Sequence, residues 1–210
     1  MKNIIFDFGN VIIDIDDNRV VDLFRQMMGD AVEPLIEELN RQDIFNKLEI
    51  GAISEESFIW AIQYAANLQI EAREIWKIWN EMLIGIPVHR LTFLENLRKR
   101  YRTFLLSNTN SIHLKAIYSH LQKDHQVHDF DTRFFEKTWY SHEVGIRKPD
   151  PAFFHFAMDD AGLKAGETLF IDDKEENVQA AEKAGLHAVL HDPFEDIVEV
   201  FEKYLSEKEK

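Results

Sequence analysis

Short apolar runs that stop at polar residues restrict the fold of this 210-residue chain more than any other feature. The first run, Ile4 to Phe6, is too brief for a helix and leads directly into Asp7, so it predicts a buried parallel strand that ends in a loop. Further strand-like runs, separated by helical patterns, lie at residues 103–106, 134–140, 168–172 and 187–190. Strands that alternate with helices in this way predict an α/β fold.

A long helical segment interrupts this alternation after the first strand. Residues 18–87 show helical periodicities with few strand signals, and the alternation of helices and strands resumes only after this segment. We therefore predict a Rossmann-like parallel sheet core formed by residues 1–17 and 88–210, with residues 18–87 inserted as an all-helical cap domain.

The charge balance excludes several kinds of partner. With 24 Lys and Arg against 38 Asp and Glu, the formal net charge of -14 argues against a nucleic-acid surface and against binding to anionic lipid. The absence of Cys excludes disulfides and thiolate sites, and no apolar run is long enough to cross a bilayer. We expect a cytoplasmic protein that acts on a small molecule.

Three carboxylates are the candidate ligands of a metal ion. Asp7 follows a predicted strand, where open α/β sheets collect their ligand groups, and Asp172 and Asp173 form an acidic pair at the end of another. Asp7 can serve as nucleophile and metal ligand together, but a carboxylate that attacks a phosphate dianion needs a cation to neutralise charge. Hard oxygen ligands favour Mg²⁺, which is the cofactor that we expect.

Three further residues offer groups suited to a phosphoryl group. Ser107 and Asn108 follow the second predicted core strand and provide a hydroxyl and a backbone N–H. Lys148 provides a positive charge, and the following Pro149 favours an extended backbone at the lysine. The combination predicts a magnesium-dependent site for phosphoryl transfer.

Each of these features has a structural alternative when it is taken alone. Asp7 could be a turn residue, Ser107 and Asn108 a helix cap, and the acidic pair a solvated turn. All of them together, in this order and with a helical insertion after the first, resemble the haloacid dehalogenase-like hydrolase superfamily. The resemblance spans nearly the whole chain, and the patches DFGNVIIDID, LLSNTN, GIRKPDPAFF and FIDDKEENV are most similar to sugar-phosphate phosphatases with a small helical cap, of the alpha-glucose-1-phosphate phosphatase type.

The resemblance implies a role for each site residue. It implies that Asp7 forms an aspartyl-phosphate, that Ser107 holds the phosphoryl group and that Lys148 balances its charge. The implied magnesium ligands are Asp7, the backbone carbonyl of Gly9, Asp172 and Asp173, and the implied substrate-binding residues are Asn10, Ser107, Asn108 and Lys148. The expected activity is hydrolysis of small phosphorylated metabolites, with a sugar phosphate as the expected substrate.

Gly9 departs from the pattern of the phosphatases in this superfamily. They usually have a second Asp two residues after the nucleophile, which protonates the leaving alcohol and then activates water. General acid–base catalysis contributes about 10²- to 10⁴-fold, so we expect a preference for anomeric, acyl or aryl phosphates, whose leaving groups need little protonation. Asp14 and Asp16 could substitute through water, although turn carboxylates are commonly structural.

Gly9 also admits two other functions. Haloacid dehalogenases lack the second Asp and attack carbon without a metal, but such a site gains nothing from the acidic pair at 172 and 173, since adjacent like charges raise each other's pKa. A non-catalytic member that binds a phospho-ligand or a partner protein is the other alternative. It predicts metal and phosphate binding without turnover.

For most of the other histidines and aromatic residues, the sequence favours a structural role over a catalytic one. We expect solvated positions for the histidines in and after the helix that follows the second core strand, namely His113, His120, His125 and His128. We expect the aromatic residues of the insertion, Trp60, Tyr64, Trp76 and Trp79, to pack in the core of the cap. Arg19 and Arg41 are candidates for contacting an anionic substrate from the cap.

Overall fold

A five-stranded parallel sheet forms the centre of the molecule, in a computed structural model that describes residues 1–208. Its strand order is β5-β4-β1-β6-β7, and every neighbouring pair is parallel. The strands are β1 Asn3–Phe6, β4 Arg102–Ser107, β5 Lys137–Tyr140, β6 Thr168–Asp172 and β7 His187–Leu190. The predicted Rossmann-like parallel sheet is confirmed.

The order of the strands brings the predicted site residues to one edge of the sheet. The chain continues from β1 to β4 and β5 on one side and then returns to β6 and β7 on the other, so β1 lies at a topological switch point. Phe6 is in register with Leu105 and with Ile171. Asp7, Ser107 and Asp172 therefore follow at the carboxyl ends of three adjacent strands, where open α/β sheets bind ligands.

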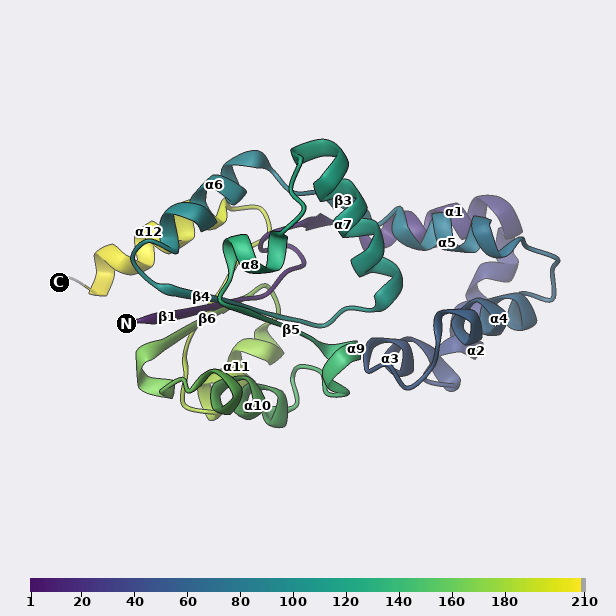
Figure 1. Cartoon of the computed structure of the whole chain (residues 1–210). Coiled ribbons are helices and arrows are strands. Elements are labelled where there is room, and N and C mark those ends of the chain that lie inside the picture. Colours follow the sequence, from purple (N-terminus) through teal and green to yellow (C-terminus); the bar gives the residue numbers. More distant parts are fainter. Residues whose placement is uncertain (209–210) are drawn as a thin grey trace.

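Helices cover both faces of the sheet (Figure 1). One face carries α6 Val88–Leu97, α7 Ser111–His125, α8 Phe130–Phe134 and α12 Ile197–Lys208, and the other carries α10 Pro151–Ala161 and α11 Glu175–Lys183. Two separate apolar clusters fill the two interfaces, because the side chains of each buried strand alternate between the faces. The short α9 Ser141–Val144 follows β5.

The inserted segment forms a group of five helices with an apolar cluster of its own. They are α1 Asp17–Met28, α2 Val32–Arg41, α3 Ile44–Glu49, α4 Glu55–Ala66 and α5 Ala72–Asn80. Short 3-10 turns lie at Gly29–Ala31 (η1) and, in the core, at Ala165–Glu167 (η2). Figure 1 shows the five helices together beyond the end of the sheet that faces α9.

Two short strands join the inserted helices to the sheet domain. β2 Asp14–Ile15 pairs antiparallel with β3 Leu83–Gly85, so the segments that enter and leave the helical group lie side by side. Asp16 caps α1 by accepting a hydrogen bond from the Asn18 N–H, and α6 begins at Val88. These limits support the predicted division at residues 18 and 87, which stays a prediction.

The strand predicted at residues 134–140 begins three residues later than expected. Phe134 closes α8, and the strand β5 starts only at Lys137. The reason is burial: Phe134 and Phe135 are 1% and 0% exposed and pack against the Phe130 ring. Tertiary packing of aromatic side chains thus overrides their strand propensity. Among the described residues, no helix is long and apolar enough to cross a membrane.

Candidate active site

A buried lysine joins two of the predicted carboxylates. Lys148 Nζ donates hydrogen bonds to Asp7 Oδ1 and to Asp172 Oδ2, each at 2.6 Å. Asp7 follows β1, Asp172 ends β6, and Lys148 lies in the loop between α9 and α10. Their exposed fractions are 8%, 0% and 1%, respectively. Residues that are far apart in the sequence therefore form one compact ionic group.

Burial shifts the ionisation of this group. Burial raises the pKa of Asp7 to about 7, and the charge of Asp172 adds to that rise, while Lys148 opposes it. Burial also disfavours the charged form of Lys148, but the two carboxylates outweigh it and raise the lysine pKa above its ordinary value. Lys148 is therefore a permanent cation, whereas ionised Asp7 depends on nearby positive charge.

The third carboxylate completes a set of donors that fits a divalent metal. One oxygen each from Asp7, Asp172 and Asp173 lies within 4.8 Å of the others. Three converging carboxylates without a thiol or imidazole suit a hard cation such as Mg²⁺. The residues present thus fit the magnesium site that the sequence predicts.

Side chains around the carboxylates fix their orientation. Asn177, on α11, donates from Nδ2 to both oxygens of Asp172 at 2.9 and 3.0 Å, and the Lys174 N–H donates to Asp172 Oδ1. Asn10 donates from Nδ2 to Asp173 Oδ2 at 3.1 Å and accepts from the Ile15 N–H. Asn10 was predicted to bind substrate, and its side chain here holds a predicted metal ligand in place.

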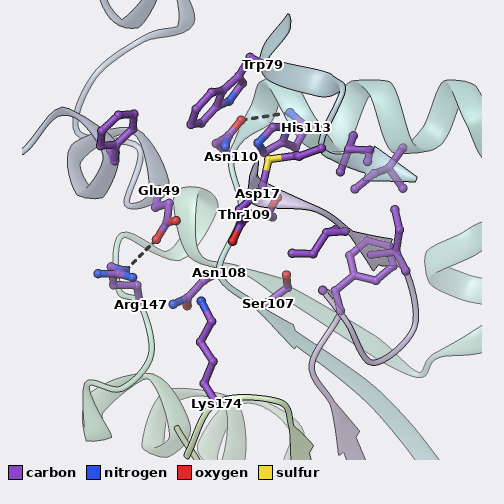
Figure 2. A pocket seen from close by; sticks show the side chains of 18 residues that line it. Asp17, Glu49, Trp79, Ser107, Asn108, Thr109, Asn110, His113, Arg147 and Lys174 are labelled. Atoms are coloured by element: carbon purple, nitrogen blue, oxygen red, sulfur yellow. Dashed lines mark hydrogen bonds and ion pairs between the residues drawn. The ribbon is translucent and has the colours of Figure 1, made fainter. Parts of the chain in front are cut away.

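The side chain of Asn108, which follows β4, holds the backbone of Lys148 in position. Its Nδ2 donates to the Lys148 carbonyl and its Oδ1 accepts from the Lys148 N–H, both at 2.8 Å. This reciprocal pair fixes the lysine backbone against the loop after β4. Ser107, the last residue of β4, is 2% exposed and lies beside Asn108 on that loop (Figure 2).

A cavity of about 240 Å³ lies next to these residues, and we call it the site cavity. Gly9, Ser107 and Asn108 line it on the side of the sheet, and Figure 2 shows Trp79 and His113 on another side. Arg147 Nε lies 2.8 Å from Glu49 Oε2 and thereby joins the loop before Lys148 to α3 of the insertion (Figure 2). The sheet core and the inserted helices therefore both contribute to the wall of the site cavity.

His113 is buried in this wall, so the prediction of a solvated histidine was wrong for it. It is 7% exposed, stacks on Trp79 with 5.1 Å between ring centroids, and donates from Nδ1 to Asn80 Oδ1. Burial lowers its pKa to about 3, so the imidazole is neutral at physiological pH. The spacing of His113 and the buried Ile117 on one helix face was the signal that could have identified it.

The structure gives Asp14 and Asp16 structural partners. Asp14 Oδ1 accepts from Arg90 Nη1 at 2.7 Å, and Asp16 caps α1. The carboxylates that line the site cavity are instead Asp17 and Glu49. Neither was singled out from the sequence, because cavity walls form between segments that are distant in the chain.

Some of the expectations for aromatic residues and arginines of the inserted segment were wrong. Trp60 and Tyr64 are 62% and 67% exposed and stack on each other, so they do not lie in the cap core. Trp76 is also exposed. Trp79 packs against the apolar cluster of the insertion as expected, and it lines the site cavity as well. Arg19 and Arg41 form surface ion pairs, with Glu81 and Glu38 respectively. Arg147, which the sequence did not indicate, is the arginine among the cavity-lining residues.

Comparison with known proteins shows to which family the chain belongs. The pattern of haloacid dehalogenase-like hydrolases matches residues 1–185. D-ribitol-5-phosphate phosphatase from Bacteroides thetaiotaomicron is 28% identical over 187 residues, which cover 88% of this chain and 89% of that protein.

Solved structures agree with this assignment. A HAD family enzyme of Bacteroides thetaiotaomicron is 32% identical and superposes with a TM-score of 0.87 over 96% of this chain and 98% of its own. The same wild-type enzyme has been solved in complex with magnesium and inorganic phosphate, with a TM-score of 0.85 over 96% of this chain and 99% of its own. L-2-haloacid dehalogenase from Xanthobacter autotrophicus, 14% identical, shares the fold with a TM-score of 0.59 over 90% of this chain and 77% of its own.

Proposed function

Since the chain belongs to the haloacid dehalogenase-like hydrolase family, we propose that it is a magnesium-dependent phosphatase that hydrolyses small phosphorylated metabolites through an aspartyl-phosphate. The observation that carries the proposal is the buried group in which Lys148 bridges Asp7 and Asp172 while Asp173 lies within metal-binding reach. A carboxylate nucleophile, a fixed cation and converging oxygen ligands are the parts that phosphoryl transfer requires.

Asp7 performs the covalent step in this proposal. One of its carboxylate oxygens attacks phosphorus, the bond from phosphorus to the leaving-group oxygen breaks, and the electron pair departs with that oxygen, which takes up a proton from solvent water. Water then attacks phosphorus of the acyl phosphate and loses a proton to solvent, which releases inorganic phosphate and restores the carboxylate. Lys148 stays protonated and counters the negative charge of the phosphoryl group in both steps.

Asp7, Asp172, Asp173 and the Gly9 carbonyl would hold the magnesium ion, which supplies charge neutralisation when it is bound. Ser107 and the backbone N–H of Asn108 would hold phosphoryl oxygens at the end of β4. The Asn108 side chain keeps the Lys148 backbone in place, and Asn10 orients Asp173.

The leaving group is the finer part of the proposal. Gly9 provides no acid at the position where phosphatases of this family usually have one, which favours leaving groups that need little protonation. Polar side chains of the site cavity, among them Asn110, His113 and Glu49, suit a hydroxylated alcohol such as a sugar. The relative named D-ribitol-5-phosphate phosphatase supports a hydroxylated alcohol as the substrate, but it does not support the preference among leaving groups, because ribitol is an alkyl alcohol.

The inserted helices act as a cap in this proposal. Residues 18–87 supply Trp79 and Glu49 to the wall of the site cavity, and residues 1–17 and 88–210 supply the catalytic groups. A cap over the site excludes water and adds substrate contacts. We propose that the enzyme works in the cytoplasm.

Phosphate release from aryl, anomeric-sugar, sugar-alcohol and alkyl phosphates, with Mg²⁺ and with EDTA, tests the proposal. We expect metal-dependent release that Asp7→Asn abolishes. Halide release from a haloacid without metal would favour a dehalogenase instead, which the third carboxylate speaks against. Magnesium and phosphate binding without any turnover would favour a non-catalytic phospho-ligand binder.

A further inference from the structure

A second cavity, of about 320 Å³, lies inside the inserted helices, and we call it the cap chamber. Its walls are almost entirely apolar and come mainly from α1 and α2, with Val21 and Phe24 on the first helix and Ile36 and Leu39 on the second. The atoms that line an empty apolar cavity lack contacts that they would otherwise make. An apolar group that fills the cap chamber restores these contacts and therefore stabilises the protein.

The cap chamber adjoins the site cavity. Four residues line both spaces: Asp17, Phe45, Trp79 and Met82. Trp79 is held face to face between Phe45, at 5.7 Å between centroids, and His113, at 5.1 Å. Figure 2 shows Trp79 and His113 at the site cavity, and Trp79 also lines the cap chamber, so a ligand that fills the site cavity meets an aromatic ring that the two cavities share.

A polar atom at this junction lacks a partner. Trp79 Nε1 is buried, and it makes no hydrogen bond within the part of the chain that the structure describes. A buried N–H without an acceptor is destabilising, and native structures usually satisfy such groups with protein, water or ligand. An oxygen of a bound ligand at the junction would satisfy this indole.

We propose that the cap chamber is a substrate subsite that takes an apolar portion of the leaving alcohol. The inference rests on the proposed function, since it assumes that the phosphate group lies against Ser107 and Lys148. The substrate class is then an amphipathic phosphate monoester, with its polar atoms in the site cavity and an apolar group beyond Trp79. A cavity of about 150 Å³ holds benzene, so the cap chamber takes an apolar group of roughly ten carbons.

Binding of unbranched alkylphosphonates tests the subsite without requiring turnover. These probes keep the phosphonate group constant, their carbon–phosphorus bond is not hydrolysed, and calorimetry in Mg²⁺ gives Kd for chains of one to twelve carbons. We expect little change for short chains, then up to about a fourfold gain in affinity per methylene once the chain enters the cap chamber, and a plateau when the chamber is full.

Ile36 offers matched variants, because it lines the cap chamber but not the site cavity. We expect Ile36→Phe, which fills the chamber, to bring the plateau to shorter chains, and Ile36→Ala, which enlarges it, to move the plateau to longer chains. Methylphosphonate, which is too short to reach the chamber, should bind both variants as it binds the wild type. That probe also shows that the variants are folded.

The outcomes separate this inference from the proposed function. Chain-length-independent binding in the wild type, or a plateau that neither Ile36 variant moves, overturns the subsite. Failure of methylphosphonate to bind the wild type in Mg²⁺ overturns it as well, because its anchor is then absent. Turnover of phenyl phosphate by the wild type is measured in parallel. Absence of turnover refutes the proposed phosphatase, whereas turnover together with a Kd that does not depend on chain length refutes only the subsite.

Discussion

Replacement of Lys148 by Met tests whether the buried ionic group is held together by one cation. The lysine ammonium is 1% exposed and lies 2.6 Å from a carboxylate oxygen of Asp7 and of Asp172. Lys148→Met keeps a similar length of apolar side chain but leaves two buried carboxylates without their cation. Removal of one partner from a buried ion pair typically lowers the free energy of unfolding by about 3–5 kcal/mol, and we expect a loss in that range.

Urea unfolding at pH 8 in EDTA measures this loss. Lys2→Met is the matched control, because Lys2 pairs with Glu167 on the surface and such exposed pairs contribute little. Saturating Mg²⁺ should narrow the gap in stability between Lys148→Met and the wild type, because carboxylates without a lysine partner bind the cation more tightly. Each tenfold lower Kd in the variant closes the gap by about 1.4 kcal/mol at saturation.

A second substitution separates charge from packing. The Asp7→Asn/Lys148→Met double variant lacks one of the two uncompensated carboxylates. Its loss of unfolding free energy should therefore be smaller than the sum of the losses in the two single variants. Wild-type stability of Lys148→Met in EDTA would refute the argument. Strict additivity in the double variant would do the same, because it would show that the two groups do not interact.

Three further results are expected. Asp7→Asn should abolish phosphate release while the unfolding midpoint stays near that of the wild type, because Lys148 keeps Asp172 as its partner and burial already disfavours the Asp7 charge. Near-wild-type turnover would remove Asp7 from the role of nucleophile. Phenyl phosphate should be hydrolysed faster than ethyl phosphate by kcat/KM, because no acid stands at Gly9; equal rates would show that a proton donor is present. Burial lowers the pKa of His113 to about 3, so between that pH and about 6.5 the unfolded chain binds the extra proton and stability falls as the pH falls. From pH 7 to pH 5 the wild type should lose about 2 kcal/mol more than His113→Gln in urea unfolding, and an equal loss in both would contradict a neutral buried imidazole.

The sequence predicted those parts of the fold and site that depend on local pattern. A short apolar run followed by Asp7 already implies a buried strand with a polar side chain at its carboxyl end, and the runs that end in Ser107 and Asp172 imply the same. Parallel strands present these ends at one edge, so the three residues could be grouped before any coordinates were known. Their catalytic roles remain predictions for the assays above.

What the sequence did not predict depends on contacts between distant segments. The sequence indicated Asn108 only as a phosphate-binding residue and did not indicate Asn177 at all. In the structure the Asn177 side chain holds Asp172, and the Asn108 side chain holds the Lys148 backbone across 40 positions. His113 lies on a helix with polar neighbours, and only packing against Trp79 and Asn80 from the insertion shows that it is buried. Such roles follow only from the positions of segments that are distant in the sequence.

The local charge of the site explains how so acidic a protein can bind a phosphate ester. Asp7, Asp172 and Asp173 face Lys148, so three carboxylates against one ammonium group leave two negative charges in excess. In the proposed site a divalent cation would bring that balance to neutral, and the phosphoryl group would then meet Lys148 and the hydrogen-bond donors after β4 without net repulsion. The formal charge of -14 is spread over the surface, where salt screens it beyond about 8 Å. Because this excess would vanish only when the metal is bound, we expect the carboxylates proposed as metal ligands to make phosphate binding depend on the cation as well.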